Sequence, residues 1–228
     1  MSTRTLLRLG GLALLLALPI EIVSDLLHPP SHELVDALKA MYGPAHIVGF
    51  VSRVLLLLGL PALYARQARR AGALGLVAFV LLMTEMAYEV YIELYEGYVT
   101  PLLAREPAAQ PLFGSNGPLA QGAGALGPLV LVLILAWPLF GVATVRAGVL
   151  PRGSGWLQIA TAPMTVLSLA LFTAMPDVLA RLPMAVQPVS ITYYLLLAGY
   201  AWGGYALWAD RERAHEVTGQ VGAPQPAA

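Results

Sequence analysis

Long apolar stretches alternate with short polar connections along this sequence. A helix that crosses the hydrocarbon core of a membrane needs about 20 predominantly apolar residues. Prolines, glycines and most of the charged residues are concentrated in the connections between the stretches. The pattern predicts an all-α polytopic membrane bundle of six transmembrane helices, at residues 5–27, 45–65, 72–100, 119–146, 155–175 and 188–208.

The basic residues are divided unevenly between the two sides of this predicted bundle. With six crossings, nine of the 13 lysine and arginine residues fall on the side of the two chain ends, and only Lys39, Arg105 and Arg181 fall on the other. Basic residues favour the cytoplasmic side of a membrane. We therefore expect residues 1–213 to form a multi-pass membrane domain with both termini cytoplasmic. Residues 214–228 are expected to be a disordered cytoplasmic tail.

The outer connection after the first span has its own helical pattern. It begins with Pro29 and Pro30, which end the preceding helix. Ser31 can then cap a short amphipathic outer helix near 31–42. Its apolar face would carry Leu34, Val35, Leu38 and Met41. Such a helix is expected to lie flat on the membrane surface.

Composition agrees with a membrane protein and excludes several functional classes. The chain of 228 residues is 58% hydrophobic and only 11% charged, with a mean hydropathy of +0.71. Soluble domains carry about 25% charged residues. The formal net charge is zero, which gives no reason to expect a nucleic-acid partner. The absence of cysteine excludes disulfides, thiolate metal sites and cysteine catalysis.

A column of carboxylates is the most informative chemical feature of the sequence. Residues 85–98 read EMAYEVYIELYEGY at the end of an apolar run. Glu85, Glu89 and Glu93 are four residues apart, so they share one face of a helix. Each carboxylate at the centre of a membrane helix costs roughly 2.5–3.5 kcal/mol on insertion scales. The column therefore requires partners, water, protons or a cation.

The predicted topology places further polar groups at a similar depth. Arg53 lies inside the second span and requires an anionic partner, because a guanidinium stays charged. Glu21, Glu85 and Glu89 are at compatible depth, so an ion pair joining the first three spans is expected. The remaining carboxylates would be protonated, hydrated or bound to a cation. The predicted ligand or cation site consists of Glu21, Asp25, Arg53, Glu85, Tyr88, Glu89 and Glu93.

A divalent metal is a further candidate ligand at the outer mouth of the bundle. Imidazoles and carboxylates together can bind Zn, Mn or Fe, and the predicted metal ligands are His28, His46, Glu89 and Glu93. His32 maps to the same mouth, but the two prolines interrupt its spacing from His28. Haem ligation by His28 and His46 is disfavoured because both lie at a shallow depth. No HExxH, GxSxG or phosphate-binding glycine loop is present, so no catalytic residue is predicted.

Several short segments resemble a broad group of uncharacterised bacterial multi-pass inner-membrane proteins of about six spans. They are LHPP at 27–30, GPAH at 43–46, GLPALYARQA at 59–68, FGVATVRAGVLPR at 140–152 and GYALW at 204–208. The resemblance implies a small helical bundle in the inner membrane. It implies no activity, because none is established for the group.

Three functions remain open at this stage. The first is an outward-facing acidic and aromatic cavity in the first three spans, which would bind or transport a cation, a proton or a small polar ligand. The second is a non-catalytic structural or accessory subunit whose charges pair with one another or with a partner. The third is an intramembrane metal-dependent enzyme. The expected partners are the lipid bilayer and either a second copy of the chain or a larger membrane complex.

Overall fold

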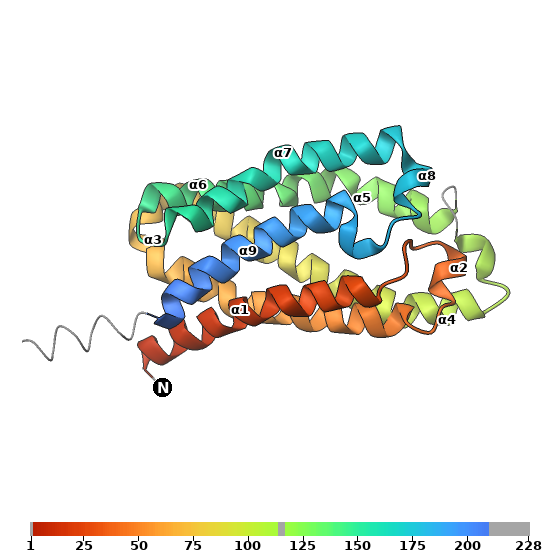
Figure 1. Cartoon of the computed structure of the whole chain (residues 1–228), viewed down its shortest axis with the longest axis horizontal. Helices are drawn as coiled ribbons and strands as arrows, with labels where there is room; N and C mark the ends of the chain where they lie inside the picture. The colour runs from red at the N-terminus through yellow and green to blue at the C-terminus, as the bar shows by residue number, and fades with distance from the viewer. Residues whose placement is uncertain (1, 114–116, 210–228) are drawn as a thin grey trace, which may run out of the picture.

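The structure, a computed structural model, describes residues 2–113 and 117–209, and all regular elements in this part of the chain are helical (Figure 1). The long helices are α1 (Thr3–Leu27), α3 (Tyr42–Leu94), α5 (Pro118–Ile134), α6 (Ala136–Ala147), α7 (Arg152–Ala174) and α9 (Pro188–Ala209). The short elements are α2 (Leu34–Ala37), a π-helical turn (Tyr95–Val99), α4 (Thr100–Arg105), α8 (Pro176–Leu179) and the 3-10 turns Gln110–Leu112 and Met184–Val186. The predicted tail at 214–228 lies outside the described residues.

Four helices in the described residues are long enough and apolar enough to cross a membrane. They are Thr3–Leu27, Tyr42–Arg105, Leu129–Ala147 and Arg152–Ala174. The prediction of an all-helical membrane protein is therefore confirmed. α9 has 22 residues but is not one of the four, since its six tyrosines and tryptophans and three glycines lower its mean hydropathy.

Helix α3 is folded back on itself at Gly72. The backbone there has φ 60° and ψ −157°, a combination that only glycine adopts readily. The rings of Tyr64 and Phe79, on either side of this break, stack with centroids 4.3 Å apart. The two legs of α3 therefore run antiparallel and correspond to the predicted spans at 45–65 and 72–100. This hairpin brings the start of α3 beside its end.

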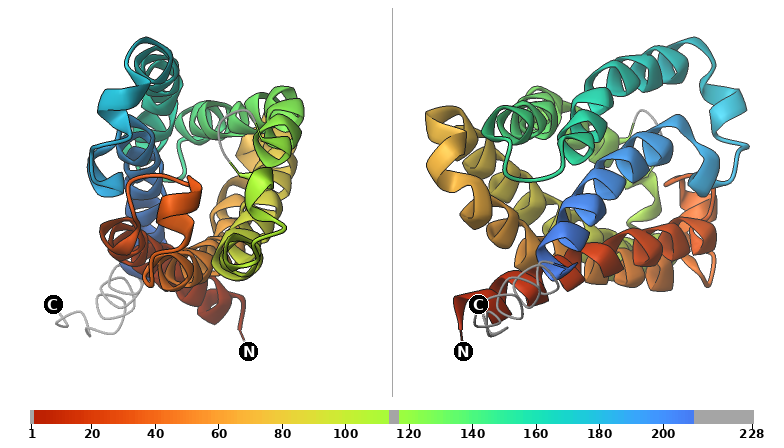
Figure 2. Two further views of the ribbon diagram at one scale, coloured as in Figure 1. Left: turned by 90° about the vertical axis from the view of Figure 1, so that its right-hand side faces the viewer. Right: turned by 60° about the vertical axis from the view of Figure 1, so that its left-hand side comes forward.

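The long helices form a closed ring, visible in the end-on view of Figure 2. α1 packs against α3 and α9, α7 against α9 and α6, and α6 against α3. A continuous apolar core fills the half of the ring near the chain's N-terminus, with Leu14, Leu63, Phe140 and Leu196 among its buried side chains. The opposite half, towards α2 and α8, carries buried charged residues and histidines, among them Glu21, His28, His46, Arg53 and Glu93.

The outer helix is much shorter in the structure than the predicted range 31–42. Only Leu34–Ala37 form α2, and Glu33 rather than Ser31 occupies the position before it. The Ser31 amide and hydroxyl instead donate to the Asp36 carboxylate, at 2.9 and 2.6 Å. Burial opposes ionisation of Asp36, but hydrogen bonds from Lys39 and Ser31 outweigh it and lower the pKa of this carboxyl. The charged Asp36 therefore holds the connection as a compact loop.

Candidate metal centre

One cavity of about 380 Å³ gathers Arg53, three histidines and several acidic residues of the bundle. It is bounded by α1, α3, α5, α6, α7 and α9 at the end that carries α2 and α8. The predicted ligand residues, though distant in sequence, all line it: Glu21, Asp25, Arg53, Glu85, Tyr88, Glu89 and Glu93. His28, His32 and His46 line the same cavity.

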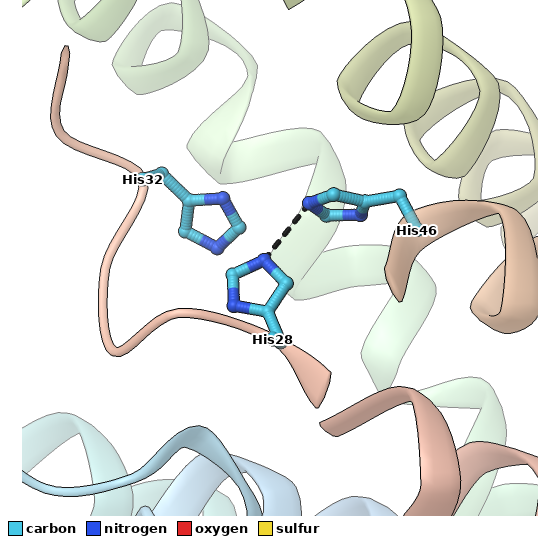
Figure 3. A group of neighbouring side chains, drawn as sticks. All are labelled: His28, His32 and His46. Carbon is cyan, nitrogen blue, oxygen red and sulfur yellow. Dashed lines mark hydrogen bonds between the residues drawn. The ribbon is translucent and has the colours of Figure 1, made fainter. Parts of the chain in front are cut away.

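Three histidines converge at this cavity, as Figure 3 shows. His28 follows the last residue of α1, His32 lies in the loop before α2, and His46 lies in the second turn of α3. One ring nitrogen of each lies within 4.8 Å of the others. The Nε2 atoms of His28 and His46 are 2.9 Å apart. We refer to these three residues as the histidine triad.

The protons of His28 and His46 can be assigned from their partners. His28 Nδ1 faces the Pro29 carbonyl oxygen, and His46 Nδ1 lies 2.9 Å from Glu93 Oε2. A carbonyl or carboxylate oxygen only accepts, so each Nδ1 carries the proton and donates it. Each neutral ring then has a lone pair on Nε2. Two lone pairs that face each other at 2.9 Å repel unless a cation or a shared proton lies between them.

The position of the proton on neutral His32 follows from its contact with a tyrosine. The Tyr42 hydroxyl donates to Glu96 Oε2 at 2.5 Å. Its oxygen is therefore free to accept from His32 Nδ1, which lies 2.9 Å away. The proton of neutral His32 is thus on Nδ1, and its Nε2 is left as the ligand atom. All three rings of the histidine triad present an unprotonated nitrogen to one another.

Burial keeps His28 of the triad in its neutral, metal-binding form. The His28 side chain is buried, and this burial, together with the neighbouring His32 and His46, lowers the pKa of His28 to about 4. The ring is therefore neutral at pH 7, well above that value. A neutral imidazole is the form that ligates a metal, whereas a protonated one must first lose its proton.

A glutamine from the far end of the chain holds the loop of the triad. Gln187, in the connection before α9, is buried and donates from Nε2 to the carbonyl oxygen of Pro30 at 2.8 Å and to that of Leu182 at 3.1 Å. Pro30 lies midway between His28 and His32. This clamp fixes the turn that folds His32 back over His28.

Glu93 connects the histidine triad to a buried ion cluster. Its Oε2 accepts from His46, and its Oε1 lies 3.1 Å from Arg53 Nη2. Arg53 also contacts Glu21 through Nη1, and its Nε lies 3.5 Å from Glu89 Oε2. The predicted ion pair between α1 and the two legs of α3 is therefore present, although Glu93 rather than Glu85 is the third carboxylate that pairs with Arg53.

The geometry changes the predicted metal ligands. Glu89 and Glu93 face Arg53, and Glu93 supports His46 from behind its ring. Neither carboxylate forms part of the cluster of ligand atoms, which is completed by His32. His32 was not among the predicted metal ligands because its spacing from His28 was judged as if both lay on one helix. The two prolines replace that helix with a turn, and the turn is what returns His32 to His28.

Asp25 and Tyr88 occupy less central positions. The Asp25 carboxylate accepts a hydrogen bond of 2.8 Å from the Tyr194 hydroxyl of α9. Tyr88 is half-buried on the wall of the cavity. Neither residue contacts the histidine triad or Arg53 by a hydrogen bond or ion pair within the described residues. They contribute to the lining of the cavity rather than to its two polar clusters.

The chain matches no protein-family model, no curated protein and no solved structure. Its function must therefore be inferred from the chemistry of the site.

Proposed function

We propose that the protein is a multi-pass membrane protein that binds a divalent transition-metal ion of the zinc class at His28, His32 and His46. The observation that carries this proposal is the convergence of three unprotonated imidazole nitrogens, each ring fixed by an acceptor at Nδ1. Zinc binds imidazole nitrogen at about 2.0–2.1 Å, which sets two nitrogens of a tetrahedral site roughly 3.3–3.4 Å apart. Small shifts would close the triad around such an ion.

The support around the ligands also fits a metal site. Metal-binding histidines almost always donate their second ring nitrogen to a carboxylate, a carbonyl or water. Here His46 donates to Glu93 and His28 to the Pro29 carbonyl. Histidines that merely face solvent have no need of this support. Glu89 and Glu93 of the column are less suited to hold the ion, because Arg53 already engages both.

We place the metal centre on the outer side of the bacterial inner membrane, with six crossings and both termini in the cytoplasm. The distribution of basic residues supports this orientation. The bend of α3 and the connection between α6 and α7 lie at the same end of the bundle as the N-terminus, and α2, which follows the loop of the histidine triad, lies at the opposite end (Figure 1).

A metal-dependent enzyme is the second candidate, and the number of ligands favours it. Structural zinc sites are almost always closed by four protein ligands, whereas catalytic sites keep three and leave a position for water or substrate. The histidine triad supplies three and borders the cavity. Asp25, one helical turn before His28, is a candidate general base on that cavity wall.

Metal content of the purified protein tests the proposal directly. The full chain would be purified in mild detergent, loaded with zinc, dialysed and analysed by elemental mass spectrometry. We expect close to one zinc ion per chain, removed by a chelator and restored by reloading. Cobalt in place of zinc should give the intense visible absorption of a tetrahedral site. If the loaded and dialysed protein contained no more zinc than a protein-free background sample, the proposal would be overturned.

Gly49 offers a test of the support behind His46. A Cβ at this position would lie 2.7 Å from Glu93 Oε2, so Gly49→Ala should push that carboxylate away from His46. Loss of such outer support typically costs about 10–100-fold in metal affinity. Zinc affinity would be measured by competition with a chromophoric chelator.

Gly127→Ala is the matched control, because a Cβ at Gly127 meets nothing within 4 Å. It should bind zinc as tightly as the wild type. Equal affinities for the two variants would show that Glu93 does not support the ligand.

A further inference from the structure

The inner part of the cavity contains three buried polar atoms without a hydrogen-bond partner. They are Glu85 Oε2, the Tyr193 hydroxyl oxygen, and Trp137 Nε1, whose N–H faces the Glu85 carboxyl group without a hydrogen bond of normal geometry. The three side chains are 2%, 8% and 9% exposed, and all three line the cavity. Buried polar groups are nearly always paired, and an unpaired one weakens the fold. Three around a single cavity indicate a site whose partner is a ligand.

The neighbouring arginine does not serve as that partner. Arg53 is held by Glu21, Glu89 and Glu93, and Glu85 is not among its ion pairs. Towards Tyr193 it presents its guanidinium to the ring face, 4.3 Å from the centroid, rather than to the hydroxyl. The unpaired atoms therefore form a separate polar pocket, which we call the inner pocket.

The chemistry of the inner pocket selects the group that it would hold. The indole N–H of Trp137 only donates, the phenol of Tyr193 donates or accepts, and the carboxyl group of Glu85 offers an acceptor oxygen. An ammonium group would satisfy Glu85 but leave the indole N–H unpaired. A hydroxyl group both donates and accepts, so it satisfies the carboxyl and one or both donors.

Apart from the ion cluster around Arg53 and the histidine triad, much of the remaining cavity wall is apolar. It includes Ile92, Val130, Leu133, Ile134 and Val189. A volume of about 380 Å³ falls within the range of small-molecule sites. Glu85 precedes Glu93 by eight residues on the same helix, which corresponds to about 12 Å along its axis. The inner pocket and the histidine triad therefore lie at different depths of one cavity, with the ion cluster of Arg53 and an apolar wall between them.

We propose that this cavity binds an amphiphilic molecule with an aliphatic chain, whose hydroxyl group is held by Glu85, Trp137 and Tyr193. The chain lies along the apolar walls and extends towards the histidine triad. The site does not require the metal, so it can be tested independently of the metal centre.

A fluorescence experiment tests the site with a defined probe. The other three tryptophans, Trp156, Trp202 and Trp208, would be replaced by phenylalanine, so that emission reports on Trp137 alone. The probe is an octane bromohydrin, which carries its quenching bromine beside the hydroxyl group. We expect saturable quenching, and at least about 10-fold weaker quenching by bromooctane, which lacks the hydroxyl. The protein is kept in chelator, so the metal has no influence on the result.

Two variants separate a binding role from a structural one. Glu85→Leu removes an unpaired buried carboxyl group, so it should abolish saturable quenching and raise the melting temperature by about 2–4 °C. Tyr193→Phe keeps the ring under Arg53 but removes the hydroxyl group, so it should weaken binding of the bromohydrin by about 10-fold. A lower melting temperature for Glu85→Leu, or unchanged quenching in both variants, would overturn the proposal. Equal quenching by bromohydrin and bromooctane would also overturn it and leave water as the partner of these atoms.

Discussion

Replacement of His46 by alanine is expected to lower the affinity for zinc by at least about 100-fold, because it removes one of three ligands together with its carboxylate support. His46 is the triad member with a buried glutamate behind its ring, and its Nε2 faces that of His28 at 2.9 Å. The affinity would be measured by competition with a chromophoric chelator at pH 7. His32→Ala should give a comparable loss.

The chain supplies a matched control for these variants. His215 is the fourth and last histidine of the sequence and lies outside the described residues. His215→Ala should bind zinc with the affinity of the wild type. If His46→Ala also retained that affinity while His215→Ala lost it, the metal would bind elsewhere and the triad would not be its site.

Replacement of Arg53 by methionine is expected to reduce the free energy of unfolding by about 3–5 kcal/mol, since it leaves buried carboxylates without their counter-charge. Arg53 is 6% exposed and contacts Glu21, Glu89 and Glu93. Arg53→Lys should reduce the free energy of unfolding by less, because the positive charge remains. It should still cause some loss, because one ammonium group cannot reproduce the forked hydrogen bonding of the guanidinium. Unfolding would be followed by denaturant titration in mild detergent.

A second substitution distinguishes ionic pairing from simple packing. Adding Glu21→Gln to Arg53→Met removes one of the uncompensated carboxylates and should restore part of the lost stability. The two changes are therefore expected to be non-additive, as for groups in direct contact. Additive losses would indicate that Arg53 stabilises the fold through its contact with the Tyr193 ring and not through Glu21.

The helical architecture could be predicted from the sequence because one strong rule controls it. Backbone groups in a bilayer must be paired within the segment, so long apolar stretches become helices. Depth along each predicted span then placed Arg53 near Glu21, Glu85 and Glu89, and the structure shows the contacts with Glu21 and Glu89 but none with Glu85. Such reasoning succeeds when two residues are related by the regular rise of helices that start at the same membrane surface.

The proposed metal centre was only partly predictable because its geometry depends on a turn and on close packing. His32 reaches the triad through the Pro29–Pro30 turn, whose shape no helical spacing describes. Glu93 fits behind His46 because Gly49 leaves room for its carboxylate. The inner pocket was hidden for a similar reason, since Trp137 and Tyr193 come from helices that follow Glu85 much later in the chain. The inner pocket is recognised by buried polar atoms that lack hydrogen-bond partners, and a sequence does not display that lack.

The clamp on the loop of the histidine triad also imposes an order on synthesis. His28, His32 and His46 lie within the first 46 residues, whereas Gln187, which holds Pro30, follows about 140 residues later. At about 5–20 residues per second, the ribosome adds Gln187 roughly 7–28 s after His46. The nascent chain thus presents its ligands on an open loop before the clamp exists. An ion that binds during this interval is enclosed only when α9 docks, so metal capture and completion of the bundle become successive steps of biogenesis.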